Sequence, residues 1–155
     1  MDATLLEREL VIAAPPRRVW PVVSDIRRMP EWSPQAVSTR LRAGFERVEA
    51  GTRFTNRNSH GEMEWITHGE IVRFEVDREI AFRIEENWVI WSFLLEPHEE
   101  GTTLVQRREA PEGISPFSRE LTETYMGGRE TFDALMSEGM SQTLAGIAGA
   151  VLDPR

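Results

Sequence analysis

Three polar side chains fall on faces that otherwise read as apolar where the chain alternates between apolar and polar residues. Asn58 shares its face with Phe54, and Gln106 and Arg108 follow Leu104 at intervals of two. Inside a protein such groups could orient a ligand, and Arg108 could also polarise a ketone or move a proton. The alternative is a hydrogen-bonded or solvated role, because a register shift of one residue would turn all three to solvent.

Two further candidates for acid–base work, Tyr125 and Arg129, lie in the last third of the chain. Arg129 follows Gly127 and Gly128, whose small size leaves space around a guanidinium. Several other kinds of catalysis are excluded because the residues that they need are absent from the sequence. The chain has no cysteine and no lysine, which excludes thiol nucleophiles and Schiff bases. It also has no Gly-x-Ser-x-Gly elbow, no P-loop and no Rossmann glycine pattern, so we predict no cofactor.

A metal site is not predicted either. The histidines are His60, His68 and His98, and none stands four residues from another in the spacing that a helical zinc site uses. Alternation places His68 with Ile66 and Glu70, opposite the apolar face of its strand. We expect these histidines to have structural or surface roles.

The elements that must position these residues are strands followed by one long helix. A first strand covers Glu7–Ile12, and Pro16 begins a helix that runs to Asp25. The connection Arg27–Pro34 has room for one short second helix. From Ala36 the apolar period changes from 3.6 to 2, which predicts six consecutive antiparallel strands. Their cores are 37–41, 54–58, 63–76, 80–85, 89–95 and 102–108, with a hairpin loop at 97–101.

The long helix is predicted from about Ser118 to Ala148. Its apolar residues are Leu121, Tyr125, Phe132, Leu135, Met136, Met140, Leu144 and Ile147. Four glycines interrupt this stripe, each at a cost of about 1 kcal/mol relative to alanine. Methionine and glycine together indicate either a helix that lines a space or one that fits an irregular core.

Strands that run together, with helices at the ends, define an α+β fold. An antiparallel sheet of six or seven strands curls and needs a cover on its apolar face, and only the long helix can supply it. The strand 89–95 is apolar on both faces. Its outer face either meets a partner subunit or is shielded by long Arg and Glu side chains, and we favour the shielding.

Length, composition and net charge limit the classes of protein to which this chain can belong. The chain has 155 residues and 40% apolar residues, which predicts one soluble domain over residues 1–155. The net charge of −8 argues against nucleic-acid binding, which needs clustered positive charge. No apolar run is long enough to span a membrane, and the first residues lack the bases of a signal peptide, so we expect a cytoplasmic protein.

Three segments carry a resemblance to a known family. They are ELVIAAPPRRVWPVVSDIRRMPEWSP, NWVIWSFLLEPHEEGTTLVQRRE and GGRETFDALMSEGMSQTLAGI. The chain resembles the polyketide cyclase/dehydrase branch of the START-like (SRPBCC, Bet v 1-like) superfamily over nearly its whole length. The resemblance implies a helix-grip fold, in which a curved antiparallel sheet surrounds the long C-terminal helix and leaves a deep cavity between them.

Alternation and the helical stripe then nominate residues that face the implied cavity, and Trp32 in the connection at its mouth and Arg129 beside the two glycines are added to them. The predicted ligand-binding residues are Trp32, Phe54, Asn58, Trp65, Thr67, Phe82, Trp91, Phe93, Gln106, Arg108, Tyr125, Arg129, Phe132, Met136 and Met140. For each apolar member the alternative is a plain core residue.

The resemblance implies binding of a hydrophobic small molecule, such as a lipid or polyketide, by a monomer or homodimer. One alternative is an enzyme of the polyketide cyclase, aromatase or dehydratase type that works in the same cavity. Another is a protein-interaction role with a collapsed cavity. Inward polar groups would favour the enzyme, whereas an apolar, sealed cavity would favour a carrier.

Overall fold

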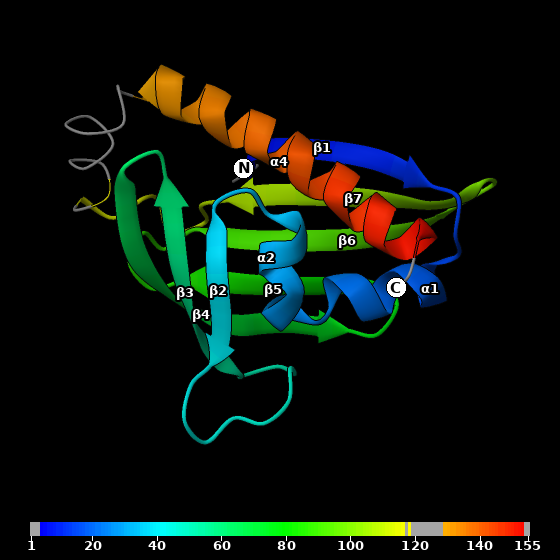
Figure 1. The fold of residues 1–155 in the computed structure, drawn as a ribbon, viewed down its shortest axis with the longest axis horizontal. Coiled ribbons are helices and arrows are strands. Elements are labelled where there is room, and N and C mark those ends of the chain that lie inside the picture. Colours follow the sequence, from blue (N-terminus) through cyan, green and yellow to red (C-terminus); the bar gives the residue numbers. More distant parts are fainter. Residues whose placement is uncertain (1–3, 117, 119–128, 154–155) are drawn as a thin grey trace.

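The computed structural model describes residues 4–116, 118 and 129–153. Seven strands and the helical segments follow the predicted order (Figure 1). The elements are β1 (Thr4–Ile12), α1 (Pro16–Val23), a 3-10 turn η1 (Ile26–Arg28), α2 (Met29–Trp32), β2 (Ala36–Leu41), β3 (Arg53–His60), β4 (Met63–Glu75), β5 (Glu79–Ile84), β6 (Ile90–His98), β7 (Gly101–Glu109) and α4 (Arg129–Leu152).

All seven strands form one antiparallel sheet in the order β1-β7-β6-β5-β4-β3-β2. Figure 1 shows α1, α2 and α4 on the same side of this curved sheet, with α4 crossing β7 and β6. The α+β fold class and the helix-grip arrangement predicted from the sequence are therefore confirmed. No helix among the described residues is long and apolar enough to cross a membrane.

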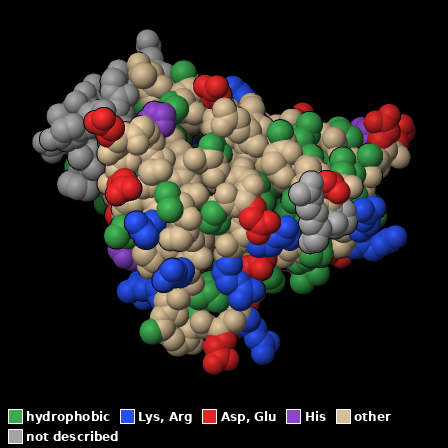
Figure 2. Space-filling view, viewed as in Figure 1, with side chains coloured by type: hydrophobic (Ala, Val, Ile, Leu, Met, Phe, Trp, Pro, Cys, Tyr) green, Lys and Arg blue, Asp and Glu red, His purple; other side chains and the backbone are tan. Residues whose placement is uncertain are grey.

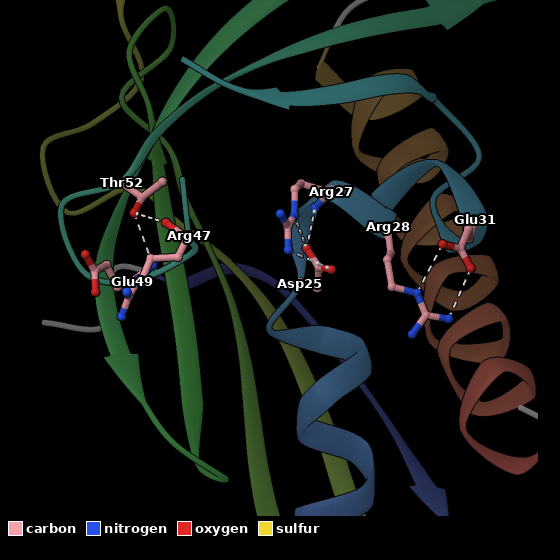
Figure 3. A network of polar contacts seen from close by, with 7 residues as sticks. All are labelled: Asp25, Arg27, Arg28, Glu31, Arg47, Glu49 and Thr52. Atoms are coloured by element: carbon pink, nitrogen blue, oxygen red, sulfur yellow. Dashed lines mark hydrogen bonds and ion pairs between the residues drawn. The ribbon is translucent and has the colours of Figure 1, made fainter. Parts of the chain in front are cut away.

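The connection between α1 and β2 is fixed by short-range polar contacts (Figure 3). Asp25 caps η1 by accepting hydrogen bonds from the backbone N–H and side chain of Arg27. Arg28 forms a paired contact with Glu31, and this hydrogen bond raises the pKa of the guanidinium. These contacts hold the one-turn helix α2, which buries Met29 and Trp32 against the rest of the protein.

Several boundaries differ from the prediction, among them the start of β1 at Thr4 instead of Glu7 and the end of α1 at Val23 instead of Asp25. The hairpin loop predicted at 97–101 is shorter, because β6 continues to His98 and β7 begins at Gly101. A side chain at Gly101 would collide with the carbonyl oxygen of Ile12, so only glycine lets the hairpin pass so close to β1. The long helix ends at Leu152 instead of Ala148. Residues 119–128, which include Leu121 and Tyr125, lie outside the described residues.

The stripe on α4 is placed as its spacing predicts. Met136, Met140, Leu144, Ile147 and Val151 are all buried. Leu144, Ile147 and Val151 belong to the main apolar core with α1 and the sheet. The two methionines lie nearer the start of the helix, where they line an internal space instead.

Charged side chains lie over part of the outer face of β6. Ser92 points outward yet is only 1% exposed, and its hydroxyl lies 3.3 Å from Glu109. Arg73 lies across this position and contacts both Glu79 and Glu109 at 3.3 and 3.2 Å. Long charged side chains from neighbouring strands thus surround Ser92, and the shielding of the apolar residues on this face stays a prediction.

Candidate functional site

A cavity of about 1030 Å³ lies between the sheet and the helices α2 and α4. Its lining comes from α2, from the inward faces of β3 to β7, from the turn between β5 and β6, from the segment 110–118 and from α4. The predicted residues that line it are Trp32, Asn58, Trp65, Thr67, Phe82, Trp91, Phe93, Gln106, Arg108, Phe132, Met136 and Met140. On β3, β5, β6 and β7 the lining residues lie on the predicted face, whereas β4 contributes Glu64 and Ile66 from its other face as well as Trp65 and Thr67.

One predicted residue, Phe54, is placed differently, and two others have side chains outside the described part of the chain. Phe54 is fully buried but does not line the cavity, which corrects our assignment. Its ring lies over Gly69 of the neighbouring strand and meets Phe82 edge-to-face, with centroids 5.4 Å apart, so it packs beside the cavity wall. Tyr125 lies outside the described residues. Arg129 is the first described residue of α4, and its side chain is not described.

Arg108 is the most deeply buried charged group of the cavity, at 3% exposure. Antiparallel pairing places it beside Trp91, and its guanidinium carbon is 5.8 Å from the centre of that ring. On the helix side it is 5.2 Å from the ring centre of Phe132. The guanidinium is therefore between two aromatic rings, an arrangement that favours a cation and fixes its position.

The asparagines on β3 are held by neighbouring strands. Asn58 donates its amide N–H to the hydroxyl of Thr67 at 3.1 Å. Asn56, which we did not select although it shares that strand face, is 4% exposed and accepts a hydrogen bond from Thr39 at 2.6 Å. The same alternation that indicated Asn58 could have identified Asn56.

Two other buried polar atoms of the cavity wall have no hydrogen-bond partner within the described part of the chain. They are Nε1 of Trp32 and Oε1 of Gln106. Both side chains line the cavity, and both residues are more than nine-tenths buried.

Residues in connecting segments complete one end of the cavity, and no periodic signal in the sequence marks them. They include Glu86 and Asn87 in the β5–β6 turn, and Gly113, Ile114 and Ser118 before the last helix. The backbone carbonyl of Glu86 accepts a hydrogen bond from the hydroxyl of Ser115 at 2.7 Å. This contact ties the turn to the segment 110–118.

His68 lies outside the cavity lining, on the predicted opposite face. Its Nδ1 is 2.6 Å from the carboxylate of Glu86, and Glu85 completes a group whose ligand atoms lie within 4.8 Å of one another. Glu86 also accepts the backbone N–H of His68, and Glu85 lies 3.7 Å from Arg42. These contacts engage the three side chains with protein groups, and we assign no metal to them.

Charge on the outer surface does not form a basic track on the face seen in Figure 2. Arginine side chains there stand beside aspartates and glutamates. The pairs Arg27–Asp25 and Arg28–Glu31 are examples. This mixture fits a protein with 26 acidic and 18 basic residues.

The sheet, the covering helix and the internal cavity define the class of helix-grip cavity proteins, and solved structures share this fold. The protein TTHA0849 from Thermus thermophilus has a TM-score of 0.69 and 21% identity, over 95% of this chain and 96% of that chain. The Zhui aromatase/cyclase from Streptomyces sp. R1128 has a TM-score of 0.71 and 16% identity, over 95% and 92%. The di-domain aromatase/cyclase StfQ from the steffimycin biosynthetic pathway has a TM-score of 0.74 and 16% identity, over 96% of this chain and 50% of that one.

The family follows from the sequence itself. The model of the family described as "Polyketide cyclase / dehydrase and lipid transport" matches residues 4–143, and the chain belongs to this family. No curated protein matches the sequence.

Proposed function

We propose that this protein binds a hydrophobic small molecule, a lipid, polyketide or similar compound, in the cavity between the sheet and α4. The observation that carries the proposal is the cavity itself, at about 1030 Å³ and with walls that include Trp91, Phe93, Met136 and Met140. Ligand pockets are typically roughly 300–1,000 Å³ and mostly apolar, with a few polar groups that set orientation. An open space of this size supports ligand binding more than it supports the alternative of a collapsed core with a protein-interaction role.

An enzymatic role is the second candidate, and the buried polar groups favour it. Arg108, Gln106 and the Asn58–Thr67 pair all line the cavity. A fixed guanidinium could stabilise the negative charge that develops on a carbonyl oxygen during a cyclisation or dehydration. Two of the structural neighbours are described as aromatase/cyclases. Replacing Arg108 with leucine would then abolish turnover while leaving binding of an apolar ligand in place.

The first test is native mass spectrometry of the purified protein, followed by identification of any molecule that denaturation releases. The proposal expects a bound lipid or polyketide-like compound, or binding from a panel of lipids and aromatic compounds. The same masses report whether the protein is a monomer or a homodimer. A clean unliganded mass together with no binding from the panel would contradict the proposal.

A cavity-blocking variant separates internal binding from surface adsorption. Met136 is 9% exposed and lines the cavity, so Met136→Trp fills part of the space. Leu152 is 51% exposed at the end of α4, and Leu152→Trp is the matched control. We expect the first variant to lose the ligand and the second to keep it. Equal retention by both would place the ligand outside the cavity.

A further inference from the structure

Two neutral side chains of the cavity wall each bury a polar atom that lacks a hydrogen-bond partner among the residues described. The first is the indole N–H of Trp32, a residue 4% exposed, and the second is the side-chain oxygen of Gln106, a residue 6% exposed. In folded proteins roughly nine in ten or more of the buried polar groups are paired. Two unmet atoms in one cavity therefore point to a partner that comes from outside the chain.

Both side chains approach the same part of the cavity. Trp32 comes from α2 and packs edge-to-face on Phe93, with ring centroids 5.7 Å apart. Phe93 is the cross-strand neighbour of Gln106, so the amide lies beside the ring that Trp32 covers. The amides of Asn56 and Asn58, by contrast, already contact hydroxyl groups of adjacent strands. The unmet hydrogen-bonding capacity is therefore concentrated between α2 and β7.

We infer that the ligand carries a hydroxyl group, as an alcohol, a phenol or an enol, and that Trp32 and Gln106 recognise it. The inference rests on the proposed function, because it requires that the cavity takes a ligand. An indole N–H only donates and an amide oxygen only accepts, so a shared partner must both accept and donate. A hydroxyl does both. A carboxylate or ketone has no hydrogen to donate to the side-chain oxygen of Gln106. An ammonium group has no lone pair to accept the N–H of Trp32.

A small side-chain movement opens this contact. Both unmet atoms are covered by protein, so the ligand oxygen reaches the amide after a turn of the Gln106 side chain. The terminal torsion of glutamine has a broad distribution, and this turn therefore meets little resistance. The indole N–H of Trp32 also has to be uncovered, because its ring packs on Phe93 while Gly146 of α4 packs against its Cβ and backbone.

Three matched fluorescent probes test the inference: 1-hydroxypyrene, 1-methoxypyrene and 1-methylpyrene. Their rings are the same, but their substituents differ. The hydroxyl group both accepts and donates a hydrogen bond, the methoxy group only accepts one, and the methyl group does neither. At about pH 6 the phenol is protonated. We expect the hydroxyl compound to bind about tenfold or more tightly than the methyl compound, with the methoxy compound between them.

Variants assign the preference to its residues. Gln106→Leu should bring the hydroxyl and methoxy probes to equal affinity, and Trp32→Phe should remove the advantage of the methoxy probe over the methyl probe. Gln142→Leu makes the same chemical change at an exposed position of α4 and should leave all three affinities unchanged. Binding of 1-methylpyrene to each variant shows that its cavity is still formed.

The outcomes separate this inference from the proposed function. Equal affinity for the hydroxyl and methyl probes would overturn the inference while leaving the binding function intact. Equal affinity for the hydroxyl and methoxy probes would mean that Gln106 presents its N–H, and would overturn the requirement for a hydroxyl. Failure of all three probes to bind would overturn both proposals.

Discussion

At the scale of single residues, Gly69 shows how the cavity wall is packed. A side chain at this position would overlap the ring of Phe54, which covers the glycine. That ring in turn supports Phe82, which lines the cavity. The aromatic ring is thus stacked on the backbone of β4, and the missing side chain makes room for it.

We expect Gly69→Ala to lower the free energy of unfolding by about 2 kcal/mol, because overpacking forces the Phe54 ring out of place. Gly149→Ala is the control, since no described residue lies within 4 Å of the added methyl group and alanine favours a helix. It should raise stability by about 1 kcal/mol. Urea denaturation measures the free energy of unfolding of both variants. Equal changes would show that the contact between Phe54 and Gly69 does not contribute to stability.

At the scale of elements, the contact between α2 and α4 decides where Trp32 sits. A methyl group at Gly146 would lie 2.9 to 3.1 Å from Cβ, Cα and the carbonyl oxygen of Trp32. Backbone atoms cannot move aside as a flexible side chain can. This glycine of the stripe therefore serves close helix packing, whereas among the described residues only Pro34 lies within 4 Å of a methyl group at Gly139, at 3.9 Å.

Gly146→Ala should therefore push α2 away from α4, lower stability by about 1–3 kcal/mol and weaken ligand binding through the displaced Trp32. Gly139→Ala should keep the fold and gain up to about 1 kcal/mol from helix propensity. Thermal unfolding and titration with 1-hydroxypyrene measure both effects. If Gly146→Ala bound the probe normally, the position of α2 would not matter for the site.

At the scale of the whole molecule, a ligand in the cavity joins the sheet to α4. A ligand that binds only the folded state raises the free energy of unfolding by about 2.7 kcal/mol at a free concentration of one hundred times its Kd. The gain requires an open cavity, so it should disappear in a variant that fills the space.

We accordingly expect 1-hydroxypyrene to raise the thermal midpoint of the native protein and of Leu152→Trp. It should have no effect on Met136→Trp, whose new indole occupies the cavity. Differential scanning fluorimetry at several probe concentrations measures the shift. A shift of equal size in Met136→Trp would indicate binding at the surface.

Much of the fold followed from local patterns. The period of two predicted the inward faces of β3 to β7, which place Asn58, Phe93 and Arg108 along the cavity. Prolines and glycines marked most of the turns, and the spacing of Met136 and Met140 indicated the buried side of α4. These features depend on the order of neighbouring residues, so the sequence alone determines them.

Contacts between distant segments were decided only by the tertiary structure. The alternation that selected Phe54 could not reveal that its ring covers Gly69 instead of facing the cavity. Nor did any pattern place Trp32 over the neighbour of Gln106, or Glu86 beside the segment 110–118. Such contacts depend on strand pairing, sheet curvature and close helix packing, which bring together residues that are far apart along the chain and share no periodic signal.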